Sequence, residues 1–568
     1  MNHYDVASHM LLESFIRKNH RILFFCFWLL INLSQAFGTE LFDDEAYYWI
    51  YSRYLAWGYF DHPPMIAWLI KLGYSIFANE LGVRLLVVLL NTATIYLISR
   101  LIEKKDDLFF YAIASSIAVA QIGGIIAVPD TPLLFFVALF FTVYKRFIDS
   151  MSIGNTISLA FCMALMLYSK YHGVLVILFT LISNPSLLKK YQAWLAVGVS
   201  VILFAPHLIW QFNNGFPSVQ FHLFERNAAS YQLSFTLEYI AGQIALAGPL
   251  LGFLFLWGAF RYQPNSVTER ALKFSLIGIY GIFLLSSLKG RVEANWTIPG
   301  FVGLIVLSHQ YFIDRPTSRI WIFRTAIITL VIMFAARVFM LVDLPPSELI
   351  SKDEFHQNKK TAKLIKEKSQ GLPLVVVNSY QRASKYAFYG QQMAFSLNSP
   401  LYRRNNFNYW PIEDSLIGKQ VYVIGPVREL RGEPILSNYY RDQNGRIVDK
   451  YFSFSKVRFN EVSDPWLSNN KILLSTTINI PSHYTSYFQQ FPYDTCSIQL
   501  AVYNEDGDFV QYISSGIRVK SLKKSTESIN LGFDHSLSPG IYTAKLAIST
   551  CLPGIPSLNS TGFGVNLK

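Results

Sequence analysis

Long apolar stretches with few charges follow one another through the first 345 residues of this chain, and they limit its fold more than any other feature. A helix needs about 20 predominantly apolar residues to cross the hydrocarbon core of a bilayer. Hydrophobic residues make up 52% of the chain and charged residues only 15%, whereas soluble domains carry about 25% charged residues. The composition also excludes a disordered chain, which needs low hydrophobicity and high charge. The sequence therefore favours a membrane protein with a soluble part.

The positions of these stretches predict eleven membrane-spanning helices. Their ranges are 22–38, 81–99, 108–128, 131–147, 155–169, 171–183, 193–210, 235–259, 272–288, 296–312 and 321–342. The pair within 155–183 is short for two crossings, so a tight helical hairpin and one long helix both stay open. The segment 65–78 is too short to cross easily, and we expect it to lie along the membrane interface. Because many spans follow the stretch 22–38, we expect a retained first helix there rather than a cleaved signal peptide.

The distribution of Lys and Arg predicts the orientation of these helices. Arg17, Lys18 and Arg21 precede the first span, and cytoplasmic loops are enriched in basic residues. Alternating the spans from a cytoplasmic N-terminus places every later basic cluster in the cytoplasm. These clusters are Arg100/Lys104/Lys105, Lys145/Arg146, Lys189/Lys190, Arg261/Arg270/Lys273 and Arg315/Arg319/Arg324. The C-terminal region then lies outside the cytoplasm.

The net charge of +12 raises the alternative of nucleic-acid binding. The sequence shows no zinc-finger spacing, no RNA-recognition signature and no long basic run. Since basic loops are expected in a membrane protein, we expect no nucleic acid as a partner.

The chain changes character near residue 345, where Pro345-Pro346 precedes a polar region. Short buried strands at 373–378 and 420–425, with a helix starting at 378, are typical of an α/β region over 346–449. Alternating runs such as 471–480 predict a β-rich, sandwich-like domain over 450–568. The predicted fold is thus mainly α and polytopic over 1–345, with a soluble α/β plus β-sandwich-like C-terminal region. Whether Cys496 and Cys551 form a disulfide is left open.

The loops on the predicted outer side collect unusual residues. The first loop contains Asp44, Glu45, Tyr48 and the His-Pro-Pro turn at His62. Later turns on the same side contribute Asp130, Lys170, His172, His207, Lys289, Arg291, Glu293 and Trp296. An ionisable residue at membrane depth is costly and suggests a functional site with a partner. Acidic, basic and aromatic residues from five turns are thus expected to face one compartment.

Each of these residues also has a purely structural interpretation. Asp130 could begin a helix as an N-cap, and Lys170 could be a snorkelling anchor at a helix end. The histidines could be interfacial hydrogen-bonding residues, Arg291 and Glu293 a local ion pair, and the aromatic residues an ordinary belt. Because all of them share one predicted side, we favour a common functional site.

The residue types suit group transfer from a lipid-phosphate donor. Asp44 or Glu45 can act as a general base, and Lys170, Lys289 and Arg291 can hold a phosphate. Aromatic residues can stack on a sugar or flank a lipid tail. If the phosphate is the leaving group, cations that gather its developing charge lower the barrier.

In this order the motifs resemble those of membrane-embedded GT-C glycosyltransferases. The resemblance is to the branch that contains the bacterial, family 39-type relatives of protein O-mannosyltransferases and the lipid A aminoarabinose transferase. It rests on residues 44–49, 58–64, 128–133, 168–171, 210–216 and 289–296, and it covers about residues 20–340. The resemblance implies a GT-C-like fold and transfer from a polyprenyl-phosphate-sugar donor, with inversion, on the non-cytoplasmic side.

The resemblance also implies roles for individual residues. It carries the catalytic base onto Asp44, with Glu45 as its neighbour, and a basic position near the donor phosphate onto Lys170. Asp130 matches an acidic position at the outer end of a later span. His62 stands where the aminoarabinose transferases tend to have Lys, and we assign it to the donor site. Some relatives use a divalent metal, but no ligand cluster in this sequence defines one, so the metal is left unknown.

We therefore predict an enzyme, a hexosyl- or pentosyltransferase of the bacterial inner membrane. Its expected partners are the polyprenyl-phosphate-linked sugar, membrane lipid, and an acceptor that is lipid A, a protein or a cell-envelope glycan. A transporter or flippase of lipid-linked saccharides is the alternative function. Transporters place polar residues near the midplane and often show internal repeats, whereas here the polar residues gather at one face. An assembly protein would not need the carboxylate-rich first loop.

Overall fold

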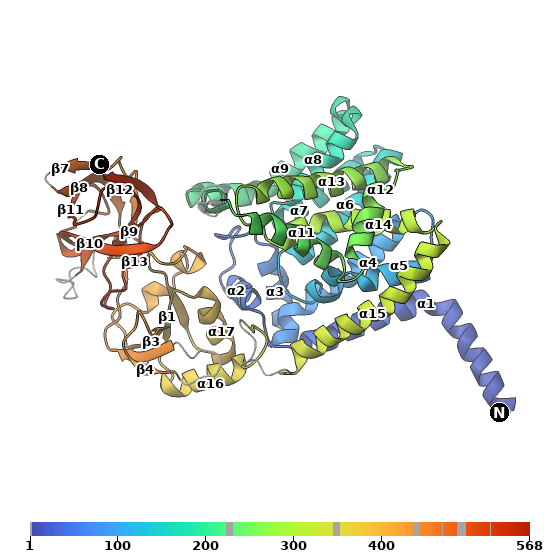
Figure 1. Ribbon diagram of the computed structural model, residues 1–568, viewed down its shortest axis with the longest axis horizontal. Helices are drawn as coiled ribbons and strands as arrows, with labels where there is room; N and C mark the ends of the chain where they lie inside the picture. The colour runs from blue at the N-terminus through green and yellow to red at the C-terminus, as the bar shows by residue number, and fades with distance from the viewer. Residues whose placement is uncertain are drawn as a thin grey trace. The chain divides into compact units, whose positions relative to one another are not determined.

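The structure, a computed structural model, describes residues 3–222, 231–344, 353–435, 443–468, 470–484, 496–522 and 524–567, apart from the side chains of residues 3–14 and 16. The chain forms two compact units, Met1–Pro345 and Pro346–Lys568. The break predicted at Pro345-Pro346 lies outside the described residues. The first unit is helical, and the second holds all the β-strands that the structure describes (Figure 1).

Six long helices form the frame of the first unit. They are α1 (His3–Gly38), α4 (Glu80–Leu101), α6 (Asp130–Asp149), α9 (Tyr191–Asn213), α13 (Val267–Ser287) and α15 (Pro316–Leu341). Within the described part of the chain, these six are long and apolar enough to cross a membrane, with α1 counted from Arg17. The protein is thus a multi-pass membrane protein, as predicted, while a total of eleven crossings stays a prediction.

Shorter helices fill the intervals between the long ones. They are α2 (Asp43–Arg53), α3 (Met65–Ile76), α5 (Asp107–Ser116), α7 (Ile153–Ser169), α8 (Gly173–Ser183), α10 (Pro217–Gln220), α11 (Leu233–Ala247), α12 (Gly252–Arg261) and α14 (Phe301–Phe312). The helix predicted at 65–78 is present as α3. The segment 155–183 forms two helices, α7 and α8, separated by a turn at Lys170–His172, so the alternative of one long helix is wrong.

The segment 235–259, predicted as one span, is broken in the structure. It contains α11 and α12, which are bent by 92°. Gly248 follows α11 at φ +138°, a conformation that favours glycine, and Pro249 has no N–H to continue the helical ladder. A Cβ on Gly248 would also lie 2.7 Å from the carbonyl oxygen of Ser116. The Gly-Pro pair explains the break.

Two further predicted spans are only partly α-helical. The segment 108–128 divides into α5 and a π-helical turn at Val119–Gly123. The segment 296–312 begins inside a 3₁₀ helix, Ala294–Gly300, which leads directly into α14. Pro299 lies inside this 3₁₀ helix and lacks the N–H that an α-helical turn would use.

The helices of the first unit share an extensive apolar core, to which Ile98 of α4, Phe141 of α6 and Leu304 of α14 contribute. Helices α1 and α4 run antiparallel, since Arg84 near the start of α4 donates to the carbonyl of Ala36 near the end of α1. Helix α15 lies beside α1 (Figure 1), where Gln35 Nε2 donates to the carbonyl of Arg337 at 3.2 Å. The C-terminal ends of α1 and α15 and the start of α4 therefore meet at one end of the unit.

The second unit begins with the predicted α/β region. A five-stranded sheet has the order β2-β1-β3-β5-β4, in which β1 (Leu374–Val377) is parallel to β2 (Ala394–Leu397) and to β3 (Val421–Pro426). Strands β5 (Gln443–Val448) and β4 (Glu433–Pro434) extend it in antiparallel fashion. The chain between β1 and β2 forms α17 (Tyr380–Gly390), and α16 (Asn358–Lys368) precedes β1.

The rest of the second unit is β-rich. One sheet has the order β10-β9-β12-β13 with β14 beside β12, and the other has β11-β8-β6 with β7 beside β8. Their bounds are β6 (Arg458–Asn460), β7 (Trp466–Ser468), β8 (Lys471–Asn479), β9 (Ser497–Tyr503), β10 (Phe509–Arg518), β11 (Thr526–Asp534), β12 (Gly540–Ile548), β13 (Ser557–Leu558) and β14 (Phe563–Leu567). Both sheets supply one core, with Leu474 from β8 and Leu500 from β9. The predicted β-sandwich is thus confirmed.

Polar contacts join the α/β region to the β-rich region. The buried carboxylate of Glu413 accepts hydrogen bonds from the Ser455 N–H (2.9 Å) and from the Tyr484 hydroxyl (2.8 Å). Cys551 carries a free thiol, whose sulfur accepts from the Phe452 N–H at 3.5 Å. The disulfide that the sequence left open is therefore not formed.

Candidate functional site

The acidic first loop folds into the start of helix α2. Asp43, Asp44 and Glu45 occupy its first turn, where negative charge interacts favourably with the helix dipole. The Phe42 N–H donates to Glu45 Oε2 at 2.9 Å, which satisfies one of the free backbone donors at the helix start. The sequence Asp-Asp-Glu therefore begins α2 and fixes the position of its side chains.

Glu45 is fully buried and forms a paired contact with Arg84 of α4. Arg84 Nε lies 2.7 Å from Glu45 Oε1, and Nη2 lies 2.5 Å from Oε2. Oε1 also accepts from the Ala127 N–H at 2.7 Å. Together with the Phe42 N–H, four donors engage the two oxygens of Glu45.

Arg84, 1% exposed, uses its remaining N–H groups on the chain that leads into the first loop. Nη1 donates to the carbonyls of Ala36 (3.2 Å) and Thr39 (2.7 Å), and Nη2 donates to the carbonyl of Glu40 (2.9 Å). We call Glu45 and Arg84 the first-loop clamp. The clamp ties the end of α1, the start of α2 and α4 to one another.

Asp44 is half-buried and differs from Glu45 in direction. Successive side chains of an α-helix point about 100° apart, so Asp44 does not share the direction of the clamp. Of the two carboxylates assigned to catalysis from the sequence, Glu45 is occupied by structural contacts. The two neighbouring carboxylates therefore point in different directions, and Glu45 is the one that Arg84 holds.

A further carboxylate of the same loop, Asp61, is 5% exposed and contacts α2. Asp61 Oδ2 accepts from the hydroxyls of Tyr47 (3.1 Å) and Tyr51 (3.3 Å). Burial is the main cause that raises the pKa of Tyr51, so its hydroxyl stays a donor at neutral pH. The ring of His62 lies 5.7 Å from that of Tyr48 and 6.3 Å from that of His222, measured between ring centroids.

Asp130 and Lys170, predicted from separate turns, lie in direct contact. Lys170 Nζ is 2.8 Å from Asp130 Oδ1, and the two side chains are 4% and 5% exposed. Asn295 Nδ2 donates to Asp130 Oδ2 at 3.0 Å. The burial of Lys170 contradicts the snorkelling interpretation, and the ion pair gives Asp130 more than a capping role.

His172, just before α8, and His207, within α9, have different surroundings. His207, 1% exposed, is bonded through Nδ1 to the carbonyl of Trp57 (2.8 Å) and through Nε2 to the Tyr171 hydroxyl (3.0 Å). The ring of His172 lies 5.5 Å from the ring of Trp296. His207 therefore joins the first loop to the turn after α7, and His172 joins that turn to the segment 294–300.

Polar side chains at the end of α9 and just after it complete the connection to the first loop. Gln211 Nε2 donates to the Tyr171 hydroxyl (2.9 Å) and to Ser218 Oγ (2.7 Å). Ser218 Oγ in turn donates to the carbonyl of Tyr59 at 3.0 Å. The outer-loop element 210–216 is thus followed directly by a residue that binds the first loop.

The cations Lys289 and Arg291 are exposed, in contrast to Lys170. Arg291 Nε lies 3.7 Å from Glu238 Oε2, and the side chains are 67% and 57% exposed. Arg291 thus pairs with Glu238 and not, as one interpretation of the sequence had it, with Glu293. Glu293 precedes the 3₁₀ helix 294–300 and is half-buried.

All five predicted turns therefore meet at one end of the first unit. The first loop contacts the start of α4 through Glu45 and α9 through Trp57, and the turn after α7 contacts α6 through Lys170. Asn295 and Trp296 bring in the segment before α14. Lys289 and Arg291 lie at the exposed side of this assembly, whereas Glu45, Asp130, Lys170 and His207 are buried within it.

Several residues of the site were missed in the sequence. Arg84 is the single charge inside the apolar segment 81–99, and an ionisable residue in a span is a functional signal by itself. Asp61 stands in the motif 58–64, where no role was predicted for it. Asn295 and Tyr171 are uncharged, and their roles follow only from contacts between distant segments.

The carboxylates Glu45 and Asp130 do not fit a divalent metal. The oxygens of Glu45 accept from four N–H groups, and those of Asp130 accept from Lys170 and Asn295. A hard divalent cation needs several free oxygen ligands. These two carboxylates are therefore engaged by the protein's own donors.

Two sequence comparisons give relatives of this chain. The sequence model of the family described as dolichyl-phosphate-mannose-protein mannosyltransferase matches residues 61–210. The lipid A galacturonosyltransferase RgtD of Rhizobium johnstonii is 23% identical over 301 residues, which cover 50% of this chain and 63% of that protein. The match thus spans less than two thirds of the length of this relative.

Crystal structures of ArnT from Cupriavidus metallidurans share the fold of this chain. The apo structure has a TM-score of 0.55 at 14% identity, with 76% of this chain and 98% of that chain covered. The structure bound to undecaprenyl phosphate has a TM-score of 0.54 at 14% identity, with coverages of 75% and 98%. These findings confirm the predicted fold class and the resemblance that the motifs indicated.

Proposed function

We propose, from the premise that this chain is a GT-C membrane glycosyltransferase of the ArnT-like branch, that it moves a sugar from a polyprenyl-phosphate-linked donor to an acceptor outside the cytoplasm. The observation that carries the proposal is the convergence of five turns at one end of the helical unit. This convergence brings the acidic first loop, the buried Lys170–Asp130 pair and two exposed cations to the same end. A general base and cations that gather phosphate charge both suit the transfer of a sugar from a phosphate.

The reaction that fits these residues is a single inverting displacement. Asp44 takes the proton of the acceptor hydroxyl while the acceptor oxygen bonds to the anomeric carbon. The bond from that carbon to the donor phosphate oxygen breaks, and polyprenyl phosphate leaves with the electron pair. Lys289 and Arg291, which are exposed, gather the negative charge on the leaving phosphate.

The buried residues of the site position this machinery. Glu45 holds α2 against α4 through Arg84, which sets the place of its neighbour Asp44. Lys170 and Asp130 hold the turn after α7 against α6, and His207 holds α9 against the first loop. We propose that His62, Tyr48, His172 and Trp296 line the path of donor and acceptor, where aromatic faces suit a sugar.

The relatives support a choice of donor and acceptor class to test. The relative RgtD is a lipid A galacturonosyltransferase, and one ArnT structure holds undecaprenyl phosphate. We propose lipid A, or a lipid A-like glycolipid of the bacterial inner membrane, as the first acceptor to test. Purified full-length protein in liposomes should transfer labelled sugar from an undecaprenyl phosphate donor to lipid A. A flippase would instead move the donor across the bilayer without releasing polyprenyl phosphate.

Removal of one exposed cation should weaken donor binding without destabilising the fold. Arg291→Ala should weaken use of the lipid-phosphate donor by roughly tenfold to a hundredfold, since a hydrogen bond to a charged group contributes about 1.5–3 kcal/mol. The exposed side chain should leave thermal stability unchanged. Donor kinetics measured against Arg319→Ala, a basic residue at the opposite end of the helices, check this. Unchanged donor kinetics would remove Arg291 from the site.

Lys170 calls for a paired design, because its partner is buried. Lys170→Ala alone leaves the Asp130 charge uncompensated, so we expect lost donor use together with lost stability. The double variant Lys170→Met/Asp130→Leu removes both charges and should recover stability. If Lys170 also contacts the donor phosphate, the double variant stays impaired in donor use; full donor use in it would leave Lys170 a purely structural role.

The membrane topology gives a further test. Reporter fusions after residues 104, 146, 190 and 265 should report the cytoplasm, and fusions after 50, 215, 292 and 400 should report the outside. The fusions at 215 and 265 are the sharpest pair, because α11 and α12 between them have 15 and 10 residues and a bend of 92°. Both helices must then cross together. A cytoplasmic signal at 400 would overturn the proposed side of the reaction.

A further inference from the structure

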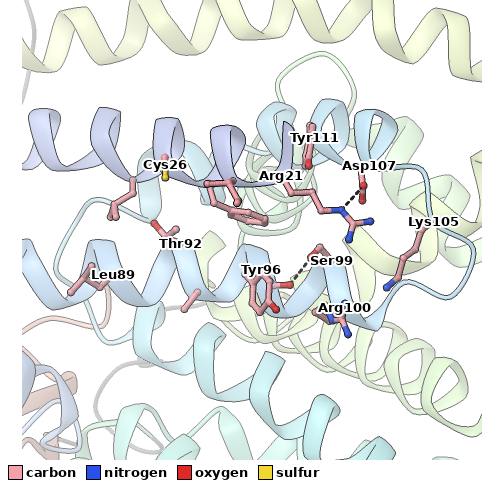
Figure 2. Close-up of a pocket in the computed structure, with 14 residues that line it drawn as sticks. Arg21, Cys26, Leu89, Thr92, Tyr96, Ser99, Arg100, Lys105, Asp107 and Tyr111 are labelled. Carbon is pink, nitrogen blue, oxygen red and sulfur yellow. Dashed lines mark hydrogen bonds and ion pairs between the residues drawn. The ribbon is translucent and has the colours of Figure 1, made fainter. Parts of the chain in front are cut away.

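A lateral cavity of about 600 Å³ lies between α1, α4 and α5, away from the candidate site (Figure 2). Arg21, Arg100, Lys105 and Asp107 lie at one end of it. Since α1 and α4 run antiparallel and meet the first-loop clamp at their other ends, this cavity belongs to the opposite end of the helical unit. The cavity is therefore separate from the proposed donor and acceptor site.

The walls of the cavity change from charged to apolar along both helices. On α1 the lining residues run from Arg21 through Phe25 to Leu29, a rise of about 12 Å at 1.5 Å per residue. On α4 they run from Arg100 through Tyr96 to Leu89 in the same direction. Figure 2 shows the charged groups together at one end and Leu89 at the other. The cavity thus has the polarity of a lipid, with one charged end and one apolar end.

The charged end carries an excess of positive charge. Arg21 Nε lies 2.6 Å from Asp107 Oδ2, so one cation is neutralised. Arg100 and Lys105 are both exposed, and within the described residues neither forms an ion pair. Burial, together with the nearby Arg100 and Arg21, lowers the pKa of Lys105. A bound anion would relieve this repulsion.

At the apolar end of the cavity, lining side chains are exposed on the outer surface of the helices. Tyr96 is 50% exposed and Leu89 is 41% exposed on a helix that is apolar enough to cross a membrane. Cys26 of α1, which lines the same cavity, is exposed as well. A soluble anion would leave this apolar surface exposed, whereas an acyl chain would cover it.

We propose that this cavity binds an anionic glycerophospholipid of the surrounding bilayer, with its phosphate at Arg100 and Lys105 and an acyl chain along Phe25, Leu29 and Leu89. Basic pockets between membrane helices recognise anionic head groups in this way. Two cations in excess favour an anionic head group over a zwitterionic one. The lipid is not the sugar donor, because its head group lies at the opposite end of α1 and α4 from the first-loop clamp.

Lipid binding to the full-length protein tests the proposal without any sugar-transfer assay. Detergent-purified protein is titrated with phosphatidylglycerol, phosphatidylcholine or inorganic phosphate, and bound molecules are counted by native mass spectrometry. The wild type should prefer phosphatidylglycerol to phosphatidylcholine by about tenfold or more. Arg100→Ala/Lys105→Ala should lower that affinity roughly twenty-five-fold, since each cation near an anionic lipid contributes about fivefold. Lys189→Ala/Lys190→Ala removes the same charge from an exposed turn and should change nothing.

A second variant tests the apolar half and does not depend on the charges. Ala93→Trp fills the cavity beside Tyr96 and should also lower phosphatidylglycerol affinity, while the cations stay in place. Equal affinity of the wild type for phosphatidylglycerol and phosphatidylcholine would overturn the proposal. It would also be overturned if Lys189→Ala/Lys190→Ala lost as much phosphatidylglycerol affinity as Arg100→Ala/Lys105→Ala. Full retention of phosphatidylglycerol by Ala93→Trp, or its complete displacement by inorganic phosphate, would reduce the site to a surface charge and would overturn it too.

Discussion

Asp44→Asn should lower sugar transfer by roughly 10²–10⁴-fold, because a positioned general base contributes about that much to a reaction. The substitution keeps the size and most of the hydrogen bonding of the side chain but removes the basic oxygen. Asp44 is half-buried at the start of α2, next to a residue whose carboxylate is engaged by Arg84. Turnover of the purified variant at saturating donor and acceptor measures the effect.

The neighbouring carboxylates supply the controls for this prediction. Asp43→Asn removes the same charge one residue earlier and should retain most of the turnover. Asp61→Asn keeps the acceptor oxygen for Tyr47 and Tyr51 and should cost less than Asp44→Asn. If Asp43→Asn is inactive while Asp44→Asn is active, the base moves by one residue. Activity in all of these variants would remove the first loop from the chemistry.

Breaking the first-loop clamp should have the largest effect on stability. Glu45→Gln leaves the Arg84 guanidinium buried at 1% exposure without its counter-charge, and breaking one partner of a buried ion pair costs about 3–5 kcal/mol. Equilibrium denaturation of the full-length protein in mixed micelles should show this loss in the helical unit. Turnover should fall with it, because the position of Asp44 depends on the clamp.

A double variant separates the stabilising role of the clamp from catalysis. Glu45→Leu/Arg84→Met removes both charges, and replacement of a buried ion pair by apolar residues is often neutral for stability. We expect it to be more stable than Glu45→Gln and to regain part of the turnover. A stable double variant with no turnover would instead give Glu45 a direct part in the reaction. An unchanged denaturation midpoint in Glu45→Gln would contradict the clamp.

The helical fold followed from the sequence because membrane helices leave a strong local signal. Long apolar runs with few charges located α1, α4, α9 and α15, since burial in lipid selects composition over the whole length of a helix. The bend between α11 and α12 was missed although Gly248-Pro249 marks it, because a smoothed apolar run hides a local break. In the second unit, the alternation in β8 was visible, whereas the order of strands depends on pairings between distant segments.

The candidate site was only partly predictable for a related reason. Charged residues in apolar surroundings are conspicuous, so Lys170, Asp130 and Glu45 were found as single residues. Their partners were not assigned, because 40 residues separate Lys170 from Asp130 and 39 separate Arg84 from Glu45. Separations of this length follow no helix or strand period, so no sequence pattern reveals that the two residues of each pair are in contact. The sequence also does not show how deeply each cation is buried. In the structure Lys170 is 4% exposed, whereas Arg291 is exposed.

The clamp also has a consequence for how the chain is made. Glu45 precedes Arg84 by 39 residues, so it leaves the ribosome before α4 reaches the translocon. An arginine adds a cost to the insertion of an apolar helix, and Glu45 and the carbonyls at 36–40 can accept that charge as soon as it arrives. Damage to Glu45 in cells should therefore first appear as chains in which α4 fails to integrate and which are then degraded.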